Sequence, residues 1–384
     1  MIRASAFARR RSPRPWWPSC CWITCCATAH RTSTCSRGKV RGRRIPTTNT
    51  KREGLPMNPH TESASITSDR VRASVAPHRV VPHPESQRLP RVVLQSDDVR
   101  LFLDDTAHIT TRSLEYVPYS RFTLTESVQR IWGASLINTL RALIVARRNG
   151  GFVLDIAEAT TNDEDLIRFT TALAHAIGTP DNDVLSGKFY ARLPVQSKDV
   201  TPQSSNLFQP YRTFGLHTDG AASPSPTTDW LVFGKTVERH VKGGRNRLLH
   251  LDDWRDLRRF ADAPQGRKPF LIALPPSNDP RQQQWGNNVR SQPLDRPIFF
   301  DWHDELCVRF ADQFIHPTTM EDAAYLREFV ESIESDPAVE YMTIPVGSMM
   351  FLNNNYWLHG REVFEPHPEL YREIIRMRGM LRAE

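Results

Sequence analysis

Residues 215–220 read Gly-Leu-His-Thr-Asp-Gly and hold two side chains that can bind a metal ion. His217 and Asp219 are two positions apart, so both side chains point to the same face of an extended strand. The flanking glycines allow the backbone to come close and to turn. A converging imidazole and carboxylate supply two of the three ligands of the 2-His-1-carboxylate site, which holds non-haem Fe(II) and leaves other positions open. The third ligand, a second histidine, is expected further along the chain.

His359 is the candidate for the third ligand. It follows a buried-strand pattern, Met349–Leu352, and a polar turn of three asparagines, 353–355. A histidine just past such a strand, followed by Gly360 and Arg361, can face the interior of a barrel. Two other interpretations stay open: His359 as a core histidine satisfied by a backbone hydrogen bond, and His217 as a surface histidine beside an acid.

Two arginines, Arg376 and Arg378, follow His359 in a segment that reads as a strand. They share one strand face, with Ile375 and Met377 on the other. Arginines that point inward need carboxylate partners, because a buried charge without a partner is costly. A guanidinium can bind a carboxylate through two parallel hydrogen bonds. The alternative is an exposed strand face with solvated charges.

The elements that must position these residues are two early helices followed by many short strands. Apolar residues at helical spacing predict helices over 125–148 and about 162–177, and a late helix over 320–333. Residues 91–104 read as a short strand and a turn, and 151–156 as a buried strand. The remaining predicted strands are 188–193, 212–217, 230–235, 247–251, 270–274, 298–300, 307–310, 341–344, 348–352 and 373–381. This order favours a β-sandwich with helices packed on one side.

The charge of the chain is unevenly distributed. Residues 1–56 hold 13 of the 50 Lys and Arg residues and a single acid, whereas the remainder holds 37 basic and 42 acidic residues. The body is therefore slightly acidic and offers no electrostatic case for nucleic acid. No apolar run approaches the roughly 18 residues that span a bilayer. Cysteine is also uneven, with Cys307 alone in the body, which suits a reducing cytoplasm.

Residues 1–56 are rich in Arg, Ser and Pro, and three interpretations compete for them. Paired cysteines at 20–21 and 25–26 suggest a zinc site, but no second pair follows at metal spacing. A basic, acid-poor segment also fits a targeting peptide. We favour a disordered or non-native extension, with Met57 as the true start. Residues 57–90 are then expected to be a flexible lead-in, and 91–384 a single domain.

The order of the ligand candidates resembles that of the Fe(II)/2-oxoglutarate-dependent dioxygenases: His-x-Asp, a histidine about 140 residues later, and arginine shortly after it. Within them the chain is similar to the glutarate 2-hydroxylase (CsiD-type) family over roughly residues 90–384. The supporting runs are Leu185–Arg192, Leu249–Trp254, Pro275–Ser277 and Trp357–Arg361.

The resemblance implies a mainly β protein with flanking helices and a double-stranded β-helix (jelly-roll) core. It implies that His217, Asp219 and His359 bind Fe(II), and that Arg376 and Arg378 bind carboxylates, one of 2-oxoglutarate and one of the substrate. Asn246 stands where related enzymes place a Ser or Thr that assists 2-oxoglutarate. The implied reaction consumes O2 and 2-oxoglutarate, hydroxylates glutarate at C2, and releases succinate and CO2. The resemblance also suggests a homotetramer.

The chain departs from the family pattern beside the ligands. It has Gly215 where the family usually carries Glu, and Ala221-Ala222 followed by a Ser/Pro/Thr-rich loop, 223–228, which is a natural lid. These differences leave the substrate open. The alternatives are the same reaction on another small carboxylate, and a non-catalytic protein that binds a metal or a carboxylate on the same scaffold.

Overall fold

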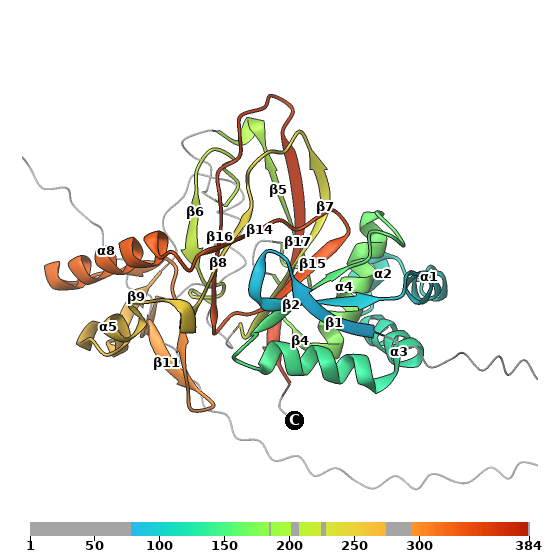
Figure 1. Ribbon diagram of the computed structural model, residues 1–384, viewed down its shortest axis with the longest axis horizontal. Helices are drawn as coiled ribbons and strands as arrows, with labels where there is room; N and C mark the ends of the chain where they lie inside the picture. Colours follow the sequence, from blue (N-terminus) through green and yellow to red (C-terminus); the bar gives the residue numbers. More distant parts are fainter. Residues whose placement is uncertain (1–77, 184–185, 201–206, 224–227, 274–292, 383–384) are drawn as a thin grey trace, which may run out of the picture. The chain divides into compact units, whose positions relative to one another are not determined.

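The computed structural model describes residues 78–183, 186–200, 207–223, 228–273, 293–382 (Figure 1). The tail 1–56, the segment 57–77, the middle of the loop expected to form a lid, and the run Pro275–Ser277 lie outside the described residues.

The largest sheet among the described residues has eight strands. Seven follow one path, β1-β2-β3-β15-β7-β17-β4, and β5 pairs with β17. Neighbours are antiparallel except β2 and β3, which are parallel. The strands are β1 (His78–His83), β2 (Ser86–Leu94), β3 (Gly151–Asp155), β4 (Gly178–Pro180), β5 (Ala191–Gln196), β7 (Trp230–Arg239), β15 (Ser348–Asn353) and β17 (Tyr371–Leu381).

A second, smaller sheet has the order β14-β8-β16-β6 and carries both candidate histidine ligands. Its strands are β14 (Glu340–Met342), β8 (Asn246–His250), β16 (Trp357–Arg361) and β6 (Phe214–His217). Two short accessory sheets consist of β9 (Phe270–Ile272), β10 (Leu294–Arg296) and β13 (Ile315–His316), and of β11 (Phe299–Trp302) and β12 (Glu305–Val308).

Alternation along the strands separates two apolar layers. In β15, Met349 and Phe351 pack with helices α3 (Ser120–Val145) and α4 (Asp163–Ile177), whereas Met350 and Leu352 pack in a cluster that contains residues of both sheets, for example Leu248. This inner cluster is the interior of the double-stranded β-helix, so the predicted mainly β fold with a jelly-roll core is confirmed. The candidate site lies in this interior.

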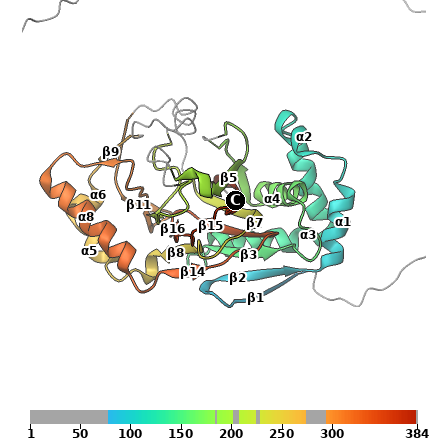
Figure 2. The same ribbon diagram turned by 90° about the horizontal axis from the view of Figure 1, so that it is seen from above.

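Helices form two groups, one on each side of the strands in Figures 1 and 2. The first packs on the outer face of the large sheet: α1 (Ser96–Asp105), α2 (Thr111–Tyr116), α3 (Ser120–Val145) and α4 (Asp163–Ile177). The second packs with the accessory strands: α5 (Leu257–Ala261), α6 (Pro264–Arg267) and α8 (Met320–Ser335). Single turns of 3-10 helix occupy Ser197–Asp199 and Leu251–Asp253.

The predicted helical stripe of α3 is confirmed, since Val128, Trp132, Leu136, Leu140 and Ile144 are buried. The helix is longer than predicted and kinked at Gly133, whose φ is 71°. Helix α4 begins at Asp163, where the Asn162 side chain accepts hydrogen bonds from the next backbone amides. No helix among the described residues is long and apolar enough to cross a membrane.

Two predictions near the start of the body are wrong. Residues 78–90 are not a flexible lead-in, because β1 and β2 form a hairpin whose inner positions, such as Leu89, are buried. Within 91–104 a short strand and a turn were expected; the strand is the end of β2, at Leu94, and the helix α1 follows in place of the turn. Asp97 and Asp98 lie in its first turn, where they favour the helix dipole, and Val99, Phe102 and Leu103 are buried at helical spacing.

Candidate metal centre

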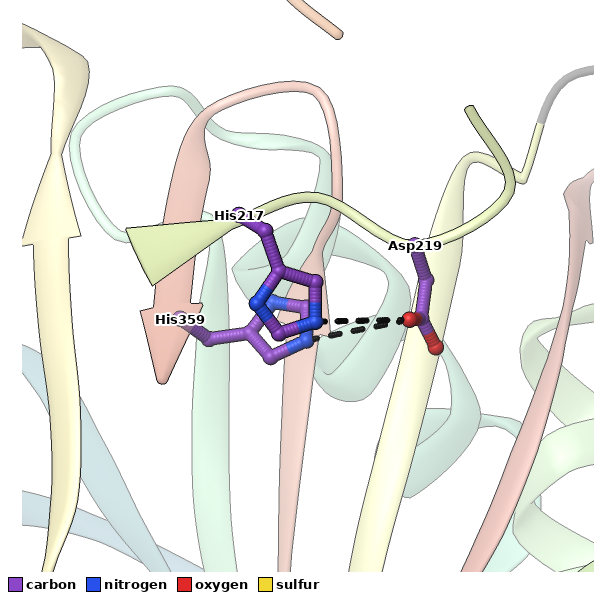
Figure 3. Close-up of side chains that lie close together, drawn as sticks. All are labelled: His217, Asp219 and His359. Carbon is purple, nitrogen blue, oxygen red and sulfur yellow. Dashed lines mark ion pairs between the residues drawn. The ribbon is translucent and has the colours of Figure 1, made fainter. Parts of the chain in front are cut away.

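Three side chains that are distant in the sequence converge in the interior of the double-stranded β-helix (Figure 3). His217, Asp219 and His359 each offer a ligand atom, and these atoms lie within 4.8 Å of one another. The Nε2 atoms of His217 and His359 are 3.8 and 4.0 Å from Oδ1 of Asp219. Two imidazole nitrogens and one carboxylate oxygen therefore face one point, the donor set that suits Fe(II).

Strand pairing accounts for the meeting of the two histidines. Strands β6 and β16 are antiparallel neighbours, and His217 lies directly opposite His359, with ring centroids 4.3 Å apart. His359 was expected just past a strand, but it lies within β16. Asp219 follows the end of β6, and Thr218 between the ligands is held by Phe310, whose carbonyl accepts from the Thr218 amide at 2.7 Å.

The surroundings of both imidazoles suit metal binding. Nδ1 of His217 donates to the carbonyl of Gly215 at 2.8 Å, which leaves Nε2 with its lone pair toward the carboxylate. Burial lowers the pKa of His359 to about 3, helped by the neighbouring His217 and opposed by Asp219. His359 is therefore neutral at physiological pH, the form that binds a metal.

The backbone of Asp219 is fixed by Asn354, from the turn before β16. The Asp219 amide donates to Oδ1 of Asn354, and Nδ2 of Asn354 donates to the Asp219 carbonyl, both at 2.9 Å. Gly220 follows with a φ of 76°, and a Cβ there would lie 2.4 Å from Oγ1 of Thr228. Only glycine meets both conditions, so this position is built for the turn that presents Asp219.

Arg376 links the candidate ligand Asp219 to a second buried carboxylate, Asp183. Its Nη1 is 3.0 Å from Oδ2 of Asp219, and its Nη2 is 2.6 Å from Oδ2 of Asp183. Burial acts to raise the pKa of Asp219, but Arg376, with His359 and Arg378, outweighs it and holds that pKa well below its usual range. Asp219 is thus an anion ready for a cation.

A pocket opens from the three candidate ligands along the interior of the fold. The space between its lining side chains is about 540 Å³, including the part open to solvent. Its polar lining consists of the three ligands with Asn246, Arg361, Arg372 and Arg376, and its remaining walls are mostly apolar, among them Leu193, Leu207, Phe214, Phe233, Leu248, Met350 and Ile374.

Arg372 is a pocket residue that the sequence interpretation missed. It is 4% exposed, its Nη2 donates to Oδ1 of Asn246 at 3.3 Å, and its Nε has no hydrogen-bond partner. Burial lowers its pKa to about 10, so it is still a cation at neutral pH. No carboxylate pairs with it within the described ranges. The alternation that places Arg376 and Arg378 on the inner face of β17 also includes position 372, and that pattern is the signal that could have found it.

The structure places the other predicted binding residues as follows. Asn246 lines the pocket; its Nδ2 donates to the carbonyl of Met342 at 3.1 Å, and its Oδ1 accepts from Arg372. Arg378 is 4% exposed, and it forms no hydrogen bond or ion pair with the residues that the structure describes. It lies close enough to Asp219 to lower the pKa of that carboxylate.

The departures from the expected family pattern lie beside the pocket. A Cβ at Gly215 would come 3.3 Å from Oε1 of Glu334, which also accepts from the Leu216 amide. Ala221 and Ala222 are buried in the apolar cluster around α5 and α8, and neither is among the residues that line the pocket. Gly215, Ala221 and Ala222 therefore do not line the described part of the pocket.

Solved structures of non-haem iron oxygenases share this fold. Asparagine oxygenase in complex with Fe(II), 2S,3S-3-hydroxyasparagine and succinate has a TM-score of 0.58 at 14% identity, covering 74% of this chain and 91% of that one. The non-haem iron oxygenase OrfP in complex with Fe and alpha-ketoglutaric acid has a TM-score of 0.55 at 15% identity, covering 76% and 94%.

The sequence comparisons identify the family. The family model CsiD matches residues 78–381. Proteins named glutarate 2-hydroxylase from Salmonella paratyphi B and Salmonella typhimurium are 33% identical over 307 residues, which cover 78% of this chain and 89% of each relative. The match begins at β1, so the hairpin that the sequence interpretation left out belongs to the shared domain. With this extent of similarity and a fold of the same kind, the chain belongs to the CsiD family.

Proposed function

We propose that this protein is an Fe(II)/2-oxoglutarate-dependent dioxygenase that hydroxylates glutarate at C2. The products are 2-hydroxyglutarate, succinate and CO2. The observation that carries the proposal is the buried set of two histidines and one carboxylate, which opens onto a pocket lined by Arg372, a buried arginine with no carboxylate partner among the described residues. The relatives named glutarate 2-hydroxylase support the choice of substrate.

His217, Asp219 and His359 hold the iron. They approach from one side, as two strands and the turn after β6 dictate, and this leaves the other coordination positions to 2-oxoglutarate and dioxygen. When bound, Fe(II) supplies the activation of dioxygen that couples decarboxylation of 2-oxoglutarate to oxidation of a substrate C–H bond. The residues of this chain bind and orient 2-oxoglutarate and the substrate, and they exclude water from the site.

Arg372 binds the far carboxylate of 2-oxoglutarate. Its guanidinium is desolvated, free of a carboxylate partner within the described residues, and held by Asn246 at the pocket wall. A buried cation in this state gains most from an ionic hydrogen bond to a carboxylate. Leu193, Leu248 and Ile374 line the space around it and suit the methylene carbons of the co-substrate.

Arg378 binds a carboxylate of the substrate. It is buried, forms no hydrogen bond or ion pair with the described residues, and alternates with the outward-facing Ile375 and Met377 along β17. Two ligands with three distal carboxylates, one on 2-oxoglutarate and two on glutarate, account for more than one inward arginine. The family resemblance implies carboxylate binding by Arg376 as well, but the Arg376 guanidinium is already paired with Asp183 and Asp219.

A panel of short carboxylates tests the proposal. Purified protein is supplied with Fe(II), 2-oxoglutarate and one acid at a time: dicarboxylates of four to six carbons and the monocarboxylate pentanoate. We expect the highest kcat/KM, measured by succinate release, for glutarate. A different preferred acid would replace the substrate and keep the reaction class. Anaerobic binding of Fe(II) and 2-oxoglutarate without oxygen consumption for any acid would favour a non-catalytic binding protein.

Assembly and location complete the proposal. We expect a homotetramer, as the family resemblance suggests, which light scattering of the purified protein would test. We expect a cytoplasmic location, which fits the single cysteine of the body, Cys307, because this residue is buried and forms no disulfide. Fractionation of cells that express the full chain would check it.

A further inference from the structure

Arg376 engages its whole guanidinium with two carboxylates of the protein. Nε and Nη2 both donate to Oδ2 of Asp183, at 3.1 and 2.6 Å, and Nη1 lies 3.0 Å from Oδ2 of Asp219. Asp183 is 1% exposed and Arg376 is 6% exposed. The charge of Arg376 is therefore already compensated by the protein itself.

The two oxygens of Asp219 have separate partners. Oδ1 faces the Nε2 atoms of His217 and His359, and Oδ2 faces Arg376. A metal ion held by the histidine nitrogens would lie on the Oδ1 side of Asp219, while Oδ2 stays in the ion pair with Arg376. A carboxylate held in this way binds a metal through a single oxygen, which keeps further positions open for other ligands.

The pairing with Asp183 separates Arg376 from the other arginines on its strand face. Arg372 and Arg378 have no carboxylate partner within the described part of the chain, whereas Arg376 has two. A ligand carboxylate at Arg376 would add a third negative charge beside two buried ones, and like charges at such distances repel strongly. Ligand carboxylates are better received at Arg372 and Arg378.

Strand pairing brings Asp183 to this place. β4 pairs with the end of β17, with Gly379 opposite Pro180, and the Asp181 amide continues the pairing by donating to the Arg378 carbonyl at 2.8 Å. Asp183 follows two residues later and reaches Arg376 on the inner face. The contact is thus a product of the sheet and lies beside the metal ligands.

We infer that Arg376 is a positioning residue that keeps Asp219 in single-oxygen coordination, and that Asp183 is the counter-ion that holds Arg376 in this role. The inference rests on the proposed iron site. Groups that orient a metal ligand typically change metal affinity by about 10- to 100-fold when they are removed.

Substitution of Asp183 is expected to lower the affinity for the metal ion. In Asp183→Asn the carboxylate charge is lost and the shape is kept, so Arg376 becomes an under-compensated cation beside the metal site. The Arg376 guanidinium then repels the metal ion and attracts the Asp219 carboxylate more strongly, so metal binding weakens by about tenfold or more. The double variant Asp183→Asn/Arg376→Gln removes that cation as well, and we expect it to bind the metal more tightly than Asp183→Asn alone.

The experiment titrates the purified full chain with Co(II), followed by its visible absorption, in the absence of substrate. Arg168→Gln is the matched control: Arg168 is another buried, ion-paired arginine, but it lies on α4 at the outer face of the large sheet, and the Co(II) dissociation constant of this variant should equal that of the wild type. His359→Ala identifies the site, since it should abolish the absorption. Circular dichroism and Tm confirm that each variant is folded, and the KM for glutarate is measured in parallel.

The outcomes separate this inference from the proposed function. Weakened Co(II) binding in Asp183→Asn, partial recovery in the double variant and an unchanged glutarate KM support it. Unchanged Co(II) binding in Asp183→Asn, no recovery in the double variant, or a glutarate KM that falls because Arg376 is freed for substrate would overturn it. Wild-type Co(II) binding that survives His359→Ala would instead overturn the metal site itself.

Discussion

The side chain of Arg372 on β17 donates to Oδ1 of Asn246 on β8 at 3.3 Å, which ties the large sheet to the small one across the pocket. This contact orients a cation that no carboxylate within the described residues neutralises. Asn246 is held in turn by its donation to the carbonyl of Met342. The pair forms a rigid receptor for an anion, which is the basis of the first prediction.

Arg372→Gln should raise the KM for 2-oxoglutarate by about 10- to 100-fold, because an ionic hydrogen bond of about 1.5–3 kcal/mol is lost. The measurement is succinate release against 2-oxoglutarate concentration at saturating glutarate. Arg245→Gln is the control, since Arg245 is next to Asn246 in sequence but is exposed and paired with Glu362. An unchanged KM in Arg372→Gln would remove Arg372 from the co-substrate site.

Arg378→Gln should raise the KM for glutarate by about 10-fold or more, for the same physical reason, and leave the KM for 2-oxoglutarate unchanged. Both constants come from initial rates with one ligand varied at a time. The opposite pattern, with the effect confined to 2-oxoglutarate, would exchange the roles of Arg372 and Arg378.

Gly220→Ala should weaken metal binding and lower the free energy of unfolding by about 1–3 kcal/mol. The φ of 76° strains any side chain, and the new Cβ would meet Thr228 at 2.4 Å, so the turn that presents Asp219 must shift. Gly133→Ala is the control: its φ is 71°, no atom lies within 4 Å of its Cβ, and it is in α3, on the outer side of the large sheet. It should lower Tm and leave the Co(II) dissociation constant unchanged, whereas tight binding by Gly220→Ala would contradict the prediction.

The free energy of unfolding should fall as the pH drops from about 6.5 toward 4. Burial of His175, whose Nδ1 donates to the Thr171 carbonyl at 2.9 Å, lowers its pKa to about 4. In the unfolded chain the ordinary value is about 6.5, so only the unfolded state gains the proton in this range, at up to about 1.4 kcal/mol per pH unit.

Urea unfolding at pH 7, 6, 5 and 4 measures this dependence. His175→Gln should flatten it in part, because the titrating group is gone, although the variant loses some stability at every pH. The control is His108→Gln, at an exposed position, which should retain the wild-type slope. Equal slopes for all three proteins would show that His175 does not contribute.

The three candidate ligands could be picked out from the sequence, and the structure brings them together. The i, i+2 spacing of His217 and Asp219 indicates one strand face, and His359 follows an unmistakable buried strand. The same alternation gives the inner face of β17. The hairpin of β1 and β2 could not be predicted from composition, because an edge hairpin buries one face only and its sequence stays polar.

The ion-pair partner of Arg376 could not be predicted from local sequence patterns. Asp183 and Arg376 are 193 positions apart and meet because β4 pairs with the end of β17. No pattern in the residues around Asp183 predicts that strand pairing. The sequence therefore predicted arginines on the inner face of β17, but not which of them pairs with a carboxylate of the protein. In our proposal, the presence or absence of such a partner decides whether an arginine holds Asp219 or binds a ligand.

The most direct measurement is the product analysis of one reaction. The purified full chain is incubated in air with Fe(II), 2-oxoglutarate and glutarate, and 2-hydroxyglutarate and succinate are quantified by mass spectrometry. Our account predicts that both accumulate in equal amounts and that a chelator of Fe(II) abolishes both. Succinate that stays at the level of the glutarate-free control, with no 2-hydroxyglutarate formed, would contradict it.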